Sequence, residues 1–77
     1  MSTQQKRQTL DMIEQADLLL ISMKGQMQIV QERAESSSQP VEYNDELHLA
    51  VMMKTMIDSV RAVLDDAAQH IAQAATA

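Results

Sequence analysis

The chain of 77 residues has no cysteine, tryptophan or phenylalanine, and only one tyrosine, one glycine and one proline. The lack of cysteine excludes disulfides, and no Cys/His cluster exists to hold a structural zinc. So short a chain forms one domain at most and buries little surface. We therefore expect its stability to come from oligomerisation or from very regular helix packing.

Strands favour aromatic and β-branched residues, and a strand-rich chain would contain more of them than this one, which has a single aromatic residue. The residues that are abundant are Ala, Leu, Met, Gln and Glu, all of which have high helix propensity. This composition predicts an all-α protein.

The chain also lacks clustered positive charge and long apolar runs. Its net charge is −5 and its six basic residues are scattered, which argues against a nucleic-acid partner. The longest strongly apolar stretch, residues 16–23, is interrupted by Asp17 and Ser22 and falls far short of the roughly 20 residues of a membrane span. The first residues lead into no apolar h-region and do not look like a signal peptide. We expect a cytoplasmic protein without a membrane partner.

Two runs of apolar residues are spaced alternately three and four apart, the pattern of one helix face. The first run is Ile13, Ala16, Leu20, Met23, Met27, Val30 and Ala34. The second run is Ala50, Met53, Ile57, Val60, Leu64, Ala67, Ile71 and Ala74. These patterns predict one helix over about 3–35 and another over about 44–74, with residues 72–77 frayed at the end.

The segment between the two runs has the chemistry of a connection. Three serines and Pro40 disfavour helix interior and predict a loop over about 36–43. Ser2 with Gln5 fits a capping box for the first helix, and Asn44 is the preferred N-cap of the second. A start at Pro40, which would bring Tyr43 toward the apolar face, is the alternative.

The two runs are mirror images about this loop. Val30 is placed opposite Ala50 and Leu20 opposite Val60, and the numbers in each opposed pair sum to 80. Such a reflection predicts an antiparallel two-helix hairpin.

Each helix is apolar beyond a single stripe, which a hairpin alone would leave exposed. Met12 and Leu19 flank the first run, and Leu49, Met56 and Val63 follow one another at seven-residue spacing beside Met52. We expect these residues to be covered by a second copy in a homodimeric four-helix bundle.

The first predicted helix carries a further apolar group outside the run of residues given above, which forms the seam, the strip of the helix expected to contact the other helix. This group consists of Leu18, Ile21 and Ile29, with Gly25 among them. A glycine inside a helix costs about 1 kcal/mol against alanine. It can be a tolerated glycine at a poorly packed site, or it can mark close approach of another backbone. The interaction residues predicted from the sequence are Leu18, Ile21, Gly25, Ile29, Leu49, Met52, Met56 and Val63.

No residue pattern indicates catalysis, a cofactor or a metal. His48 and His70 each have an aspartate within one turn, but two ligands do not make a structural zinc site, and a surface hydrogen bond is the simpler interpretation. Neither a phosphate-binding loop nor a Ser/His/Asp arrangement stands out. Asp58, Asp65 and Asp66 are interpreted as a solvated face.

The sequence thus favours a small non-enzymatic regulatory or adaptor protein that binds another, unidentified protein and is itself a homodimer. In general architecture it is similar to short two-helix inhibitors and anti-activators of bacteria and phages. Two alternatives stay open: a purely structural oligomerisation module, and an acidic phage-type inhibitor that occupies a site on a host protein.

Overall fold

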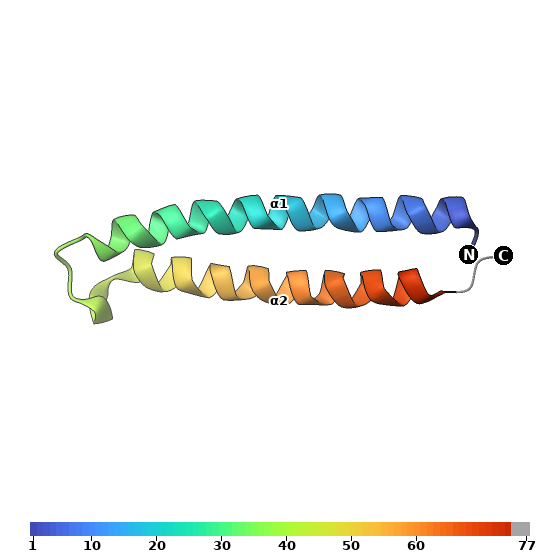
Figure 1. Ribbon diagram of the computed structural model, residues 1–77. Helices are drawn as coiled ribbons and strands as arrows, with labels where there is room; N and C mark the ends of the chain where they lie inside the picture. Colours follow the sequence, from blue (N-terminus) through green and yellow to red (C-terminus); the bar gives the residue numbers. More distant parts are fainter. Residues whose placement is uncertain (75–77) are drawn as a thin grey trace.

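The computed structural model describes residues 1–74, and it is helical almost throughout. Helix α1 spans Thr3–Glu35, a short 3-10 helix spans Val41–Tyr43, and helix α2 spans Asp45–Gln73. Figure 1 shows α1 and α2 side by side and antiparallel, with the connection at one end and the beginning of the chain at the other. The hairpin measures 60 × 16 × 11 Å. The predicted two-helix antiparallel hairpin is confirmed.

The first helix begins at the predicted capping box. The Ser2 hydroxyl accepts a hydrogen bond from the Gln5 backbone N–H at 3.1 Å, and the Ser2 backbone N–H donates to the Gln5 side chain at 3.2 Å. Each bond satisfies a backbone donor that the helix itself leaves without a partner. At the other end Arg33 lies in the last turn, where a positive charge interacts favourably with the helix dipole.

The connection is joined to both helices through Asn44, which is buried. Its side-chain oxygen accepts from the Leu47 backbone N–H at 3.0 Å, which caps α2 as predicted. Its amide nitrogen donates to the Ala34 carbonyl in the last turn of α1 at 2.8 Å. The alternative start at Pro40 is wrong, because Pro40 precedes only the 3-10 helix and Tyr43 is exposed.

The register of the hairpin follows the predicted reflection. The Lys6 ammonium donates to the Ala74 carbonyl at 3.1 Å, a pair whose numbers sum to 80. Fraying was expected from Ala72 onward, but Ala72 and Gln73 lie in or at the end of α2 and Ala74 is its C-cap residue. The rest of that expectation falls on residues 75–77, outside the described part of the chain.

The contact between the helices is narrower and more polar than predicted. Among residues 1–74, the only apolar residues that are fully buried are Ala34, Ala50 and Ile57. Met23 and Val60, which we had placed in the seam, are 47% and 48% exposed. Polar residues that precede or follow the predicted seam positions by one are partly buried instead, namely Asp17, Lys24, Gln31, Lys54 and Arg61.

The seam therefore keeps every second predicted position on each helix, and the positions between them are each shifted by one residue. On α1 it follows Leu10, Ile13, Asp17, Leu20, Lys24, Met27, Gln31 and Ala34. On α2 it follows Leu47, Ala50, Lys54, Ile57, Arg61, Leu64, Ala68 and Ile71. Both lists keep the alternation of three and four, so the same helix geometry now includes a polar residue at many of the turns.

Candidate functional site

Polar side chains bridge the two helices along one side of the seam, which we call the polar face. Arg61 Nε donates to Asp17 Oδ1 at 2.8 Å, and Lys24 Nζ donates to Asp58 Oδ1 at 2.6 Å. Further along, the Lys54 ammonium donates to the side-chain oxygens of Gln28 and Gln31. These partners satisfy the charged groups that the seam brings between the helices.

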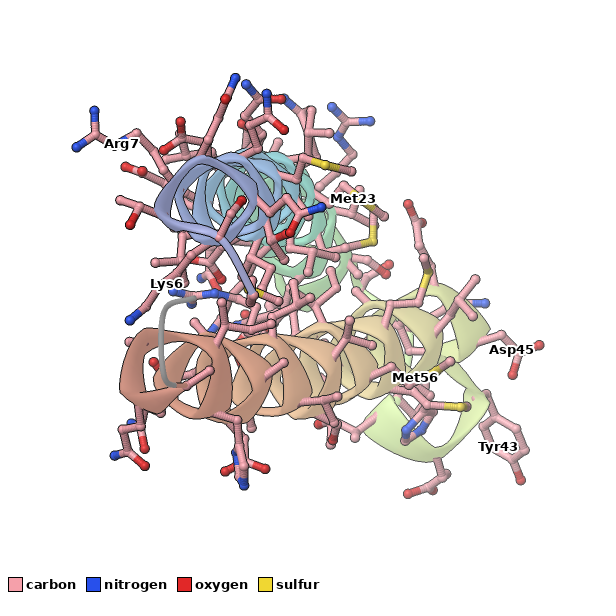
Figure 2. The ribbon with its side chains drawn as sticks, turned by 90° about the vertical axis from the view of Figure 1, so that its right-hand side faces the viewer. Lys6, Arg7, Met23, Tyr43, Asp45 and Met56 are labelled. Carbon is pink, nitrogen blue, oxygen red and sulfur yellow. The ribbon has the colours of Figure 1, made fainter. Side chains whose placement is uncertain are left out.

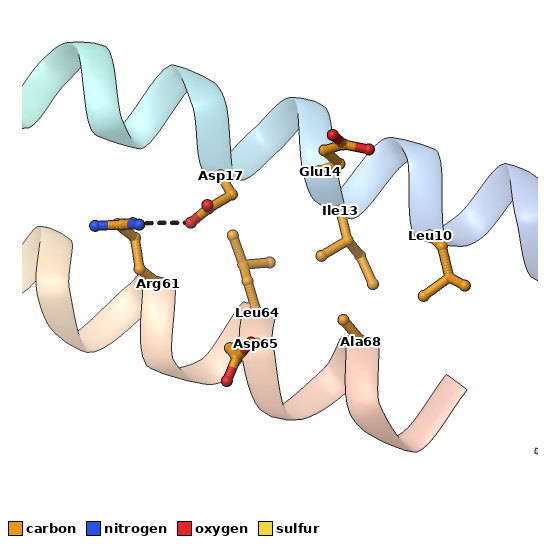
Figure 3. A pocket seen from close by; sticks show the side chains of 8 residues that line it. All are labelled: Leu10, Ile13, Glu14, Asp17, Arg61, Leu64, Asp65 and Ala68. Carbon is orange, nitrogen blue, oxygen red and sulfur yellow. Dashed lines mark hydrogen bonds and ion pairs between the residues drawn. The ribbon is translucent and has the colours of Figure 1, made fainter. Parts of the chain in front are cut away.

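A cleft on the polar face surrounds one of these bridges. Figure 3 shows the Asp17 carboxylate and the Arg61 guanidinium paired across it, with Glu14 and Asp65 at its edge. The other lining residues are Leu10, Ile13, Leu64 and Ala68. Asp17 occupies the guanidinium, and Glu14 and Asp65 leave the lining of the cleft with an excess of negative charge.

The ion pairs shift the acidity of two of their members. The hydrogen bond from Lys24 lowers the pKa of Asp58 below its ordinary value of 3.8. The hydrogen bond to Asp17 raises the pKa of Arg61 above its ordinary value. Because the pKa of Asp58 is depressed in the folded state, its stabilisation is present at neutral pH and is lost as the pH falls through that lowered pKa. Asp58 is exposed and Arg61 is only partly buried, so solvent screens both interactions.

Apolar side chains gather on the opposite side of the seam, which we call the apolar face. In an antiparallel helix pair, the positions that flank the seam on one side of each helix lie next to each other. Here those positions hold Met12, Ala16, Leu19, Met23 and Val30 on α1, interrupted by the exposed Gln26, and Leu49, Met53, Met56, Val60, Val63 and Ala67 on α2. Figure 2 shows Met23 and Met56 projecting to the same side of the hairpin, whereas Arg7 projects to the other.

The middle of the apolar face is hollowed into a groove between the helices. Its lining is entirely apolar: Leu20, Met23, Met53, Met56, Ile57 and Val60. The rims are open to solvent, since Met56 is 60% exposed, Leu19 67% and Val63 67%. Flexible thioethers on both rims allow the groove to adapt its shape to an apolar surface.

No family model, curated protein or solved structure matches the chain. Within the described residues, no group of three or more His, Cys, Asp or Glu side chains is placed to hold a metal ion. The same residues include no helix with the length and apolar character that a membrane crossing requires.

The structure separates the predicted interaction residues into two groups. Leu49, Met56 and Val63 lie together on the apolar face, with Met52 exposed beside them. Leu18, Ile21, Gly25 and Ile29 lie on other positions of α1 and take no part in either face. The sequence did not predict that Met23 and Val60 are exposed on the apolar face. Their spacing also fits the contact between the two helices, so spacing alone does not distinguish the two positions.

Both histidines make the local contacts expected of surface side chains. His48 Nε2 lies 2.8 Å from the Val41 carbonyl oxygen in the connection. His70 Nδ1 lies 2.9 Å from the Asp66 carbonyl oxygen and 3.8 Å from its carboxylate. Of the three aspartates that we interpreted as a solvated face, Asp58 is paired with Lys24, and all three are exposed.

Gly25 has no packing role inside the hairpin, because a Cβ atom built there meets nothing within 4 Å. We therefore expect Gly25→Ala to stabilise the protein by about 1 kcal/mol, the difference in helix propensity, and to raise the melting temperature by about 4–8 °C. Thermal unfolding followed by circular dichroism measures the shift. Ser22→Ala, at an exposed position of the same helix, is the matched control. A destabilised Gly25→Ala would show that another chain approaches the backbone there.

Proposed function

We propose that this protein is a small non-enzymatic regulatory or adaptor protein that acts through protein–protein contact, and that it is a homodimer in which two apolar faces meet to form a four-helix bundle. The observation that carries the proposal is the apolar face itself. It runs along both helices, and seven of its large side chains are more than two-fifths exposed in the hairpin: Met12, Leu19, Met23, Leu49, Met56, Val60 and Val63.

The exposed area supports an obligatory partner. The chain has an accessible surface of 5755 Å², whereas a compact monomer of the same mass would expose about 4,700 Å². The excess of about 1,000 Å² is comparable with the roughly 800 Å² that each partner buries in a standard protein–protein interface. A second hairpin supplies a surface of matching length and character.

The weak interior of the hairpin points the same way. Only two alanines and one isoleucine are fully buried among the apolar residues of the described chain. Covering the apolar face would bury the methionine, leucine and valine side chains that a bundle core requires. In such a dimer the second apolar group, Leu18, Ile21 and Ile29, stays available to a different protein, which is the adaptor role.

Met56→Glu tests the proposed dimer. The substitution places a carboxylate in the middle of the apolar face, where desolvation of an unpaired charge is strongly unfavourable. We expect the dissociation constant of the dimer to rise by at least about a hundredfold. Sedimentation equilibrium over a concentration series measures it, with circular dichroism recorded on the same samples.

Leu18→Glu is the matched control, since Leu18 is 56% exposed but lies off the apolar face. It should leave the dimer intact. A wild-type chain that sediments as a monomer of 8.6 kDa at every concentration would overturn the proposal. Equal weakening by both substitutions would show that the interface is not confined to the apolar face.

A further inference from the structure

The charges of the hairpin are distributed unequally along its length. The end that holds the connection, residues 32–46, carries five acidic side chains and one basic side chain: Glu32, Glu35, Glu42, Asp45, Glu46 and Arg33. The opposite end, residues 1–10 and 67–74, carries Lys6 and Arg7 and no acidic side chain. Apart from Lys6, which is partly buried, all these residues are exposed. One end of the rod is therefore strongly acidic and the other is basic.

Two hairpins can bring their apolar faces together in two symmetric ways. A twofold axis parallel to the helices places both connections at the same end and α1 of each copy against α2 of the other. A twofold axis across the hairpin places the connections at opposite ends, with α1 against α1 and α2 against α2. Either arrangement covers the whole apolar face, so apolar burial does not distinguish them.

The charge distribution does distinguish them. The first arrangement brings two acidic ends together, whereas the second keeps them at opposite ends of the dimer, each level with the end of the partner that has no acidic side chain. Arg7 itself projects away from the apolar face, so the distinction depends on keeping the acidic ends apart. Like charges placed together across an interface are unfavourable, and opposite charges favour both the orientation and the rate of association. We propose that a second copy of this chain covers the apolar face and that the connections of the two copies lie at opposite ends of the dimer. This inference rests on the homodimer proposed above.

The position of the apolar face along the hairpin is compatible with this arrangement. On α2 its residues run from Leu49 to Ala67, which centres the face on Asp58. By the register of the hairpin, Asp58 is level with Ser22, close to the middle of the apolar residues of α1. A twofold axis at this level places Met56 of each copy level with Val60 of the other. It also places His70 of each copy level with Glu46 of the other, at the two ends of the face.

The absence of native cysteine allows one spin label to be placed at a chosen site in each chain. Ser38→Cys labels the connection, and Ser22→Cys labels the middle of α1; both serines are exposed. Distances between the two copies are measured by pulsed dipolar electron paramagnetic resonance. Residue 38 lies about 16 residues from the centre of the face, so the proposed arrangement predicts a separation of about 50 Å between connection labels.

The Ser22→Cys label is the control, since it lies near the centre in both arrangements. Helices pack with axes about 8–10 Å apart, so its two copies should be separated by no more than about 30 Å either way. A long Ser38 distance with a short Ser22 distance supports the proposal. Short distances at both sites overturn it while leaving the homodimer standing. No dipolar coupling at either site overturns the homodimer together with the arrangement.

Discussion

Replacing Ile57 with aspartate should abolish the folded hairpin. Ile57 is 5% exposed and is the only large apolar side chain that is fully buried among residues 1–74. A carboxylate there would lose its hydration without gaining a partner, at a cost of several kcal/mol. Small domains have only about 5–15 kcal/mol of stability in total, and this one has few other buried residues to compensate. The far-ultraviolet circular dichroism signal at 25 °C should fall to that of an unfolded chain.

Two variants on the same helix separate burial from charge and from helix propensity. Thr55→Asp introduces the same carboxylate at an exposed position and should keep the helical signal, since Thr and Asp have similar helix propensities. Ile57→Val removes one methyl group and should cost about 0.5–1.5 kcal/mol. A helical Ile57→Asp chain with an unchanged melting temperature would show that the seam is assigned wrongly.

The local chemistry of the helix ends is predictable from the sequence. Ser2 and Gln5 form the expected capping box, and Asn44 caps α2 as expected, because these interactions join residues only three positions apart. The reflection of the apolar runs about the connection likewise predicts the register. These features depend on neighbouring residues or on spacing, both of which a single sequence contains.

The choice of seam depends on more than spacing. Each helix has apolar residues at three adjacent positions of its repeat, and a contact between two helices uses only two of them. In the structure the seam includes Asp17 and Arg61, whose side chains pair across it at 2.8 Å. The spacing of the apolar residues predicted a wholly apolar seam instead, because periodicity does not show which charged side chains become partners across a contact.

This error bears directly on function. Had Met23 and Val60 packed within the hairpin, as the spacing predicted, less apolar surface would face outward. With the polar residues in the seam, the wholly apolar positions of both helices are left on one side of the molecule. In a four-helix bundle that side faces the core, so the proposed dimer accounts for apolar residues that the contact between α1 and α2 does not use.

Asn44→Ala should destabilise the hairpin by about 2 kcal/mol, because Asn44 links the helices through two hydrogen bonds from one buried side chain. Loss of the N-cap bond to Leu47 costs about 1 kcal/mol. Loss of the 2.8 Å bond to the Ala34 carbonyl costs roughly another 1 kcal/mol. That carbonyl keeps its bond from the Ser37 backbone N–H, which limits the second loss. The melting temperature should fall by roughly 10 °C.

Asn44→Ser distinguishes the two bonds. A serine hydroxyl is an effective N-cap acceptor, but its shorter side chain does not span the distance to the end of α1. We therefore expect Asn44→Ser to recover about half of the loss measured for Asn44→Ala. Full recovery would show that the link between α1 and α2 contributes nothing and that Asn44 acts on α2 alone. Because both variants leave the apolar face unchanged, sedimentation of the two proteins should give the same mass as the wild type wherever they are folded.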